Sequence, residues 1–251
     1  MSDRPRVGLL VTCLVDFVRP QIGFAAVRLL EQSGCDVEVP LQTCCGQPAW
    51  NSGADKHATD LARQVIETFE PFDYVVAPSG SCAGMIKRHY IEALVNDPAY
   101  LPRARALAAK TFELVSFLVQ VRGVRALNVQ CATRACYHDS CSSLRELGVR
   151  KEPRKLLSEV EGLMLAELVE PEVCCGFGGL FSVKYPEISE RMADQKIVDA
   201  QATGADVIVG ADLGCLLHLK GRMQRKGINM GVRHVAEVLA GMVGEPALGE
   251  P

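Results

Sequence analysis

Residues 44–46 of the chain read Cys-Cys-Gly, and the same triplet returns at residues 174–176. In the first half, single cysteines stand 31 residues before and 37 residues after the pair; in the second half these distances are 33 and 40 residues. The two matching sets are Cys13, Cys44, Cys45 and Cys82, and then Cys141, Cys174, Cys175 and Cys215. This spacing indicates an internal repeat, with four cysteines in each copy.

Composition limits what these cysteines can be. The chain has 251 residues and 11 cysteines, and an odd count argues against a closed disulfide framework. Hydrophobic residues make up 48% and charged residues 23%, which excludes a disordered chain. The net charge is −3 and no Lys/Arg cluster stands out, so we expect no nucleic-acid or lipid surface.

The compartment follows from the apolar segments. The run over residues 7–18 is interrupted by Thr12 and Asp16 and lacks a small-residue cleavage site, so we interpret it as a buried strand instead of a signal peptide. No stretch reaches the roughly 18 apolar residues of a transmembrane helix. We therefore expect a cytoplasmic protein, in which thiols stay reduced and metal binding is the first explanation for the cysteines.

Apolar runs, caps and breakers predict alternating strands and helices in the first half. Pro20 begins a helix that ends at Gly34, and Ser52 is expected to cap a later helix. The expected elements are a strand at 7–11, a helix at 20–34, a strand at 36–39, a helix at 54–69, a strand at 74–77, a helix after residue 82, and a helical stretch after residue 102 that is broken by a strand near 112–114.

The second half repeats this order. Its expected elements are a strand within 126–137, a helix capped by Asp139 or Ser140, a strand at 163–168, a helix at 186–203, a strand at 206–209, a helix opened by 210–215, and a last helix at 233–240. Strand–helix alternation implies parallel sheets. The predicted fold is α/β, with two pseudo-repeated domains at 1–122 and 123–245, each a small parallel sheet with flanking helices.

All eight repeat cysteines follow an expected strand, so each set of four should converge at the carboxyl ends of its own sheet. Four thiolates suit an iron–sulfur cluster or zinc. The ligands come from three separate loops and include an adjacent pair, which favours a multi-iron cluster over one zinc ion. Zinc, and a thiol redox or structural role, remain as alternatives.

Glycines follow both pairs, at Gly46 and at Gly176, Gly178 and Gly179. A residue without a side chain lets backbone N–H groups come close to cluster sulfur and tune its potential. The second run lacks the final glycine of a dinucleotide-binding fingerprint, because residue 181 is Phe. We therefore assign these glycines to the cysteine sites.

Three cysteines remain outside the two sets. Cys35, Cys131 and Cys136 are expected to be packing thiols, with Cys136 the nearest to a site. His138 stands three residues before Cys141, and two interpretations stay open for it. It contacts the site from outside the ligand set, or it is a hydrogen-bonded loop histidine.

The doubled pattern resembles a family of cysteine-rich proteins that includes the cysteine-rich subunit of heterodisulfide reductase and the iron–sulfur subunit of glycolate oxidase. Within that group the chain is most similar to the lactate utilisation protein A family. The segments behind the resemblance are VTCLVD at 11–16, CCGQPA at 44–49, PSGSC at 78–82, CCGFGG at 174–179, GAD at 210–212 with GC at 214–215, and HVAEVL at 234–239.

The resemblance implies an iron–sulfur component of a three-protein system that oxidises L-lactate to pyruvate. It implies two partners, the ferredoxin-like iron–sulfur lactate utilisation protein B and lactate utilisation protein C, with electrons passing to a respiratory acceptor. It further implies that the eight repeat cysteines are the cluster ligands. A heterodisulfide-reductase-like or glycolate-oxidase-like subunit, and a zinc-stapled scaffold without catalysis, are the alternatives.

One feature departs from the wider group, whose motif ends in C-x-x-C and gives five cysteines per site. Ser79 and Asp212 stand where the first cysteine of that ending would be. Each site thus keeps four cysteines, which suits a [4Fe–4S] cube or a cluster with one iron open to substrate or to an Asp212 oxygen. Zinc in one of the repeats is a further alternative.

Overall fold

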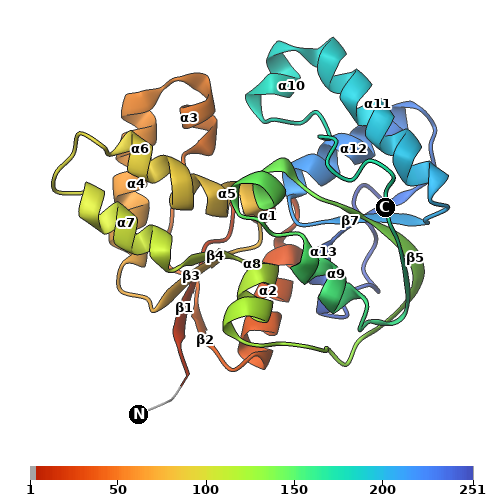
Figure 1. Ribbon diagram of the computed structural model, residues 1–251, viewed down its shortest axis with the longest axis horizontal. Coiled ribbons are helices and arrows are strands. Elements are labelled where there is room, and N and C mark those ends of the chain that lie inside the picture. Colours follow the sequence, from red (N-terminus) through yellow and green to blue (C-terminus); the bar gives the residue numbers. More distant parts are fainter. Residues whose placement is uncertain (1–3, 251) are drawn as a thin grey trace. The chain divides into compact units, whose positions relative to one another are not determined.

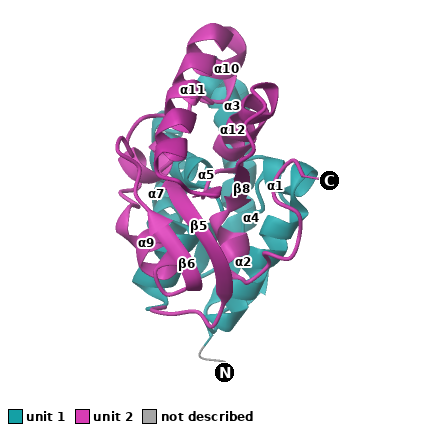
Figure 2. Cartoon of the chain, turned by 90° about the vertical axis from the view of Figure 1, so that its right-hand side faces the viewer, with its two compact units in different colours: residues 1–123 teal, residues 124–251 magenta. Residues whose placement is uncertain are grey.

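The computed structural model describes residues 4–250, and the predicted α/β fold is confirmed. The chain divides into two compact units, Met1–Gly123 and Val124–Pro251 (Figure 2). Each unit is built on its own four-stranded sheet, and every strand pair in both sheets is parallel. Helices flank each sheet (Figure 1).

The first sheet has the strand order β2-β1-β3-β4. Its strands are β1 (Arg6–Leu9), β2 (Asp36–Glu38), β3 (Tyr74–Ala77) and β4 (Thr111–Glu113). The helices and helical turns of this unit are α1 (Cys13–Val18), α2 (Pro20–Gln32), α3 (Gln47–Ser52), α4 (Asp55–Phe69), α5 (Gly80–Gly84), η1 (Met85–His89), α6 (Tyr90–Ala93), α7 (Leu101–Ala109), α8 (Leu114–Ser116) and η2 (Phe117–Val121).

The second sheet has the order β6-β5-β7-β8, which is the same topology with each strand number raised by four. Its strands are β5 (Gln130–His138), β6 (Glu161–Ala166), β7 (Val207–Gly210) and β8 (Gly231–His234). Its helices and turns are η3 (Ser142–Glu146), α9 (Lys151–Leu157), α10 (Leu180–Lys184), α11 (Pro186–Ala202), α12 (Leu213–Arg225) and α13 (Val235–Leu239). The repeat seen in the cysteine spacing is thus a repeat of topology.

Burial explains why the inner strands form. All four residues of β7 are buried, and β3 is buried at three of its four positions. A strand covered by helices on both faces reads as a continuous apolar run, as these short segments do. The inner strands β1, β3, β5 and β7 therefore set the position of the loops that follow them.

Two of the local predictions are wrong. The last helix does not begin at residue 233, because residues 231–234 form β8 and α13 begins at Val235. Here Val232 and His234 are buried while Arg233 lies between them partly exposed, which is the period of a strand. Ser52 does not cap the following helix either; it ends α3, and its hydroxyl donates to the Ala49 carbonyl oxygen at 2.8 Å.

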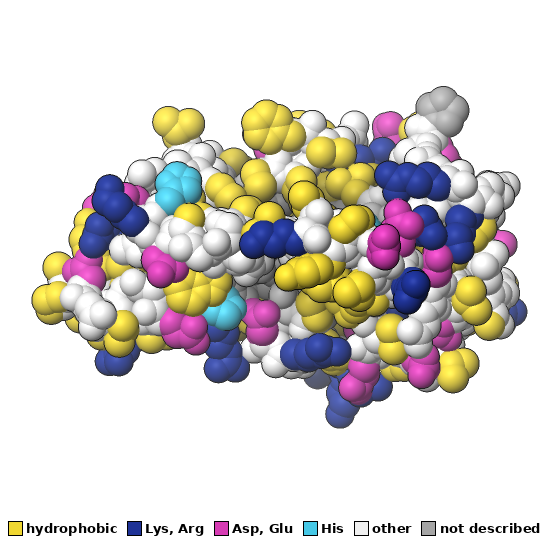
Figure 3. Space-filling view, turned by 90° about the horizontal axis from the view of Figure 1, so that it is seen from above, with side chains coloured by type: hydrophobic (Ala, Val, Ile, Leu, Met, Phe, Trp, Pro, Cys, Tyr) yellow, Lys and Arg dark blue, Asp and Glu magenta, His cyan; other side chains and the backbone are white. Residues whose placement is uncertain are grey.

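The surface carries exposed hydrophobic side chains, and some are visible on the face drawn in Figure 3. In the first unit, Phe17 on α1 is 86% exposed and Leu41 is 99% exposed. In the second unit, Val183 on α10 is 75% exposed. The longest described helix, α11, has 17 residues, and no helix among residues 4–250 is long and apolar enough to cross a membrane.

Candidate metal centres

In the first unit the structure brings the cysteine sulfurs together at the carboxyl ends of β1, β2 and β3. Cys13 is the first residue of α1, and Cys82 lies in α5 after β3. The Sγ atoms of Cys13 and Cys44 are 3.9 Å apart, and those of Cys45 and Cys82 are 3.3 Å apart. All four are free thiols, two of them buried.

Local hydrogen bonds fix the first Cys pair. The N–H of Gly46 donates to Cys44 Sγ at 3.5 Å, and Gly46 has a φ of 83°, which a residue with a side chain rarely adopts. The hydroxyl of the buried Tyr90 donates to the Cys45 carbonyl oxygen at 2.8 Å. The amide of Gln47 donates to the Ser81 carbonyl oxygen at 3.4 Å, which joins the pair's loop to α5.

The second unit repeats this geometry. The N–H groups of Gly176 and Phe177 donate to Cys174 Sγ and Cys175 Sγ, at 3.4 and 3.5 Å. Gly176 has a φ of 87°, and a Cβ there would lie 2.4 Å from the Ser189 carbonyl oxygen. Only glycine therefore fits at this point of the loop. The structure places Gly178 and Gly179, with φ of 48° and 58°, in the turn that leads into α10.

Hydrogen bonds among the thiols lower the pKa of one cysteine and raise that of another in each set. Hydrogen bonds from Cys13 and then Cys45 lower the pKa of Cys44 to about 2. The same cause, from Cys141 and then Cys175, lowers the pKa of Cys174 to about 2. The pKa values of Cys13 and Cys141 are raised, first by those same hydrogen bonds and then by burial. Each set thus holds at least one readily formed thiolate, the form that binds metal.

The buried members of each pair behave differently. Hydrogen bonds to Cys44 and Cys82, and then burial, raise the pKa of Cys45 well above its usual value. The pKa of Cys175 is raised in the same way by Cys174 and Cys215. The pKa of Cys215 is lowered to about 7, first by the hydrogen bond from Cys175 and further by His138. A cation bound here would stabilise the thiolates that burial otherwise disfavours.

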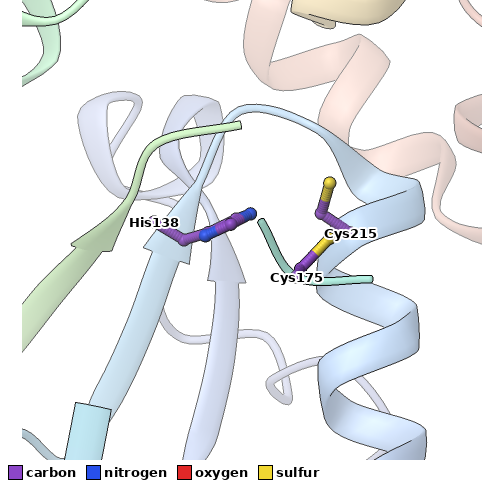
Figure 4. A group of neighbouring side chains, drawn as sticks. All are labelled: His138, Cys175 and Cys215. Atoms are coloured by element: carbon purple, nitrogen blue, oxygen red, sulfur yellow. The ribbon is translucent and has the colours of Figure 1, made fainter. Parts of the chain in front are cut away.

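His138 lies in the second site. It is the last residue of β5 and only 1% exposed, and its imidazole points toward Cys175 and Cys215 (Figure 4). Ligand atoms of these three residues all lie within 4.8 Å of one another. Neither ring nitrogen has a hydrogen-bond partner among the described residues. The interpretation of His138 as a hydrogen-bonded loop histidine is therefore wrong.

Ser79 and Asp212, the residues at the departure from the wider motif, lie close to the cysteines. Ser79 caps α5, and its Oγ accepts a hydrogen bond from the Cys82 N–H at 3.4 Å. The Oδ2 atom of Asp212 accepts hydrogen bonds from the hydroxyls of Ser140 and Ser143, the second at 3.4 Å. Ser140 also caps the turn that follows Cys141, as predicted, by accepting from the Ser143 N–H at 3.3 Å.

The other three cysteines lie in the interior, away from these contacts. Cys35 is 1% exposed, and its Sγ is 3.5 Å from Ser33 Oγ. Cys136 is fully buried within β5, and burial raises its pKa to about 11. Cys131 is 9% exposed, and burial raises its pKa as well. The raised pKa values keep Cys131 and Cys136 protonated, which is typical of packing cysteines.

The donor chemistry fits a soft metal. Thiolates select zinc, copper(I) and iron–sulfur clusters over hard cations. Each unit gathers four thiols near backbone N–H donors, and the second unit adds an imidazole. The cysteine clusters and the Cys/His group are thus suited to metal binding.

Comparison with known proteins agrees with this chemistry. The model of the cysteine-rich domain CCG matches residues 7–87 and 135–220, one copy in each unit. Lactate utilization protein A of Bacillus subtilis (strain 168) is 50% identical over 235 residues, covering 93% of this chain and 98% of that protein. Lactate utilization protein A of Halalkalibacterium halodurans is 49% identical over 235 residues, covering 93% of this chain and 96% of that protein.

A solved structure shares the fold. A hypothetical protein from Helicobacter pylori aligns with a TM-score of 0.65 at 11% identity, covering 98% of this chain and 49% of that chain. Such a low identity shows the fold alone. The two CCG matches and the near-full-length identity go further: the chain belongs to the lactate utilization protein A family, with two copies of the cysteine-rich CCG domain.

Proposed function

We propose that the chain is the iron–sulfur component of a multi-protein system that oxidises L-lactate to pyruvate. One observation carries the proposal: two matching sets of four thiols, each gathered at the end of a sheet, occur in a chain 50% identical to a lactate utilization protein A. The ligands proposed for the first centre are Cys13, Cys44, Cys45 and Cys82. Those proposed for the second are Cys141, Cys174, Cys175 and Cys215.

The electron balance explains why two centres are useful. Oxidation of L-lactate to pyruvate removes two electrons and two protons from the hydroxyl-bearing carbon and its oxygen. A [4Fe–4S] cluster held by four thiolates supplies a one-electron acceptor. Two such centres in one chain match the two electrons, which then pass to the partner proteins.

The chain's own residues would tune these centres through hydrogen bonds and burial. The N–H groups of Gly46 and Gly176 point at cysteine sulfur, and such hydrogen bonds spread the negative charge of a thiolate. Phe177 packs against α12, where a Cβ on Gly214 would lie 2.4 Å from the Phe177 ring. The ring thereby covers the helix turn that holds Cys215 and limits access of water to it.

Exposed hydrophobic side chains near both sites support partner docking. Phe17 lies on α1, which begins at Cys13, and Leu41 lies three residues before Cys44. Val183 lies on α10, which follows the second Cys pair. Apolar side chains beside a redox centre suit contact with electron-transfer partners. The proposed partners are the ferredoxin-like lactate utilisation protein B and lactate utilisation protein C.

Zinc is the second candidate, and the sulfur spacing favours it. Four thiolates around one zinc, at about 2.3 Å from the metal, hold their sulfurs about 3.8 Å apart. In the first set the observed separations, 3.9 and 3.3 Å, are near that value. Thiolates on different irons of a cube stand farther apart, so a cube requires these side chains to turn outward. A zinc-stapled scaffold would bring the partners together without accepting electrons.

Growth tests the lactate assignment. Deletion of the gene should abolish growth on L-lactate and leave growth on pyruvate unchanged, because pyruvate lies beyond the missing step. The intact gene should restore growth, and the Cys45→Ser and Cys175→Ser genes should not. Growth of the deletion strain on L-lactate at the normal rate would refute the assignment. A heterodisulfide-reductase-like or glycolate-oxidase-like role predicts normal growth of the deletion strain on L-lactate. In those roles the substrate is a disulfide or glycolate.

A further inference from the structure

His138 occupies an unusual position among the histidines of the second unit. It ends β5, and in the parallel pairing it stands beside Gly210, which in turn stands beside His234 at the end of β8. The two histidines therefore lie at the carboxyl end of the same sheet, where the cysteines gather. Both are buried, at 1% and 0% exposure.

The two imidazoles differ in their partners. His234 is fully hydrogen-bonded: its Nε2–H donates to the Ala211 carbonyl oxygen at 2.9 Å, and its Nδ1 accepts from the Ala236 N–H at 3.2 Å. His138 has no hydrogen-bond partner at either ring nitrogen among the described residues. A buried polar group without a partner is costly and calls for an explanation, such as an ion. The nearest suitable atoms are the sulfurs of Cys175 and Cys215.

The repeat provides an internal comparison. Leu10 stands three residues before Cys13, as His138 stands three residues before Cys141, and Leu10 is 1% exposed. The first unit thus fills the matching position with a hydrocarbon side chain and the second with a nitrogen donor. A packing role alone needs no imidazole there, so the difference points to a ligand present in one unit.

We propose that His138 is a metal ligand in place of Cys141 or Cys174, so that the second centre has mixed thiolate and imidazole coordination while the first has thiolates only. The inference rests on the proposed function only in that both units hold metal. Three donor atoms within 4.8 Å of one another, from β5, the Cys174–Cys175 loop and α12, form three corners of a site (Figure 4). Imidazole and thiolate together suit iron and zinc alike.

The direct test uses the holoprotein purified without oxygen, labelled with ¹⁵N only in histidine. Iron is measured first, and the reduced protein is then studied by pulsed electron paramagnetic resonance. We expect strong hyperfine coupling from one directly bound histidine nitrogen, in one of two centres. Iron without such coupling, or with only the weak coupling of a distant ring, would overturn the ligand assignment while the proposed function stands.

If the purified protein contains zinc and no iron, the proposed function is overturned. The zinc can still be used to test whether His138 is a ligand. X-ray absorption at the zinc edge should then show a nitrogen scatterer at about 2.0–2.1 Å alongside sulfur. A sulfur-only shell would overturn the inference. These measurements use the unmodified chain, so they do not depend on whether a variant folds.

Two variants add a matched comparison. His138→Leu gives the second unit the residue that the first unit has, and it should abolish the histidine coupling while the first centre's spectrum is unchanged. His218→Gln is the control, because His218 lies on α12 with its Nε2 3.1 Å from Ser189 Oγ and outside the Cys/His group. The control should keep the coupling. Loss of the coupling in His218→Gln, with retention in His138→Leu, would contradict the assignment.

Discussion

The hydroxyl of Tyr90 donates a 2.8 Å hydrogen bond to the carbonyl oxygen of Cys45, forty-five residues earlier in the chain. Tyr90 is completely buried, so this bond ties the first Cys pair to the helical segment that follows Cys82. Burial raises the pKa of Tyr90 well above its usual value, and the phenol therefore stays a donor. The bond holds the pair's backbone in place without using a sulfur.

Replacing Tyr90 with Phe should loosen the first centre. The change keeps the ring and leaves the Cys45 carbonyl without its donor, at a cost of about 1–3 kcal/mol. We expect a lower unfolding free energy in urea and a faster loss of metal from the first set to a chelator. Metal in the second set should leave at the unchanged rate. Equal acceleration at both sets would show that Tyr90 acts on overall stability alone.

Replacing Gly214 with Ala should expose the second centre. A Cβ at this position would lie 2.4 Å from the Phe177 ring, so the ring must move away from α12. We expect a chelator or oxygen to remove metal from the second set several times faster, measured as loss of absorbance. The control is Gly221→Ala on the same helix, where no atom lies within 4 Å of the new Cβ.

The control variant should stabilise the chain, since Ala is favoured over Gly inside a helix by about 0.5–1 kcal/mol. The double variant Gly214→Ala with Phe177→Ala should regain the helix stability but keep the fast metal loss. If Gly214→Ala behaves like Gly221→Ala, Phe177 does not protect the site.

Stability should fall in mild acid because of His218. Burial lowers the pKa of His218, so the unfolded chain takes up a proton near pH 6.5 that the folded chain does not. The unfolding free energy is therefore highest above pH 6.5 and decreases as the pH falls below it. Urea unfolding between pH 7.5 and 5.5 should show this slope, and His218→Gln should reduce it.

The repeat, the parallel sheets and most strands were predictable because they depend on local period and on the spacing of cysteines. The strand at 74–77 was predicted with the bounds that β3 has. The last strand of the second sheet, β8, was not predicted. Gly231–His234 runs directly into α13, and the helical pattern that follows hides the short alternation of buried and exposed residues in β8. The helix α3 was also missed, because Pro48 suggests a break in the chain. In the structure Gly46 is the residue before the helix, so Pro48 falls in the first turn, where proline is tolerated.

His138 shows a different limit. Its place beside Cys175 and Cys215 depends on the pairing of β5 with β7 and on where α12 begins, which no local pattern states. One signal was available in the sequence: the aligned repeats place Leu10 opposite His138, and a polar residue at a buried repeat position is unusual. Comparison of the two repeats position by position would have singled it out.

The iron and acid-labile sulfide content of the protein purified without oxygen tests the central claim most directly. Two [4Fe–4S] centres predict about eight irons and eight sulfides per chain, with about half of each in Cys45→Ser and in Cys175→Ser. Halving in each variant would also show that the two sets bind independently. A colourless protein with about one zinc per set and no iron, or loss of both centres from a single substitution, would contradict the account.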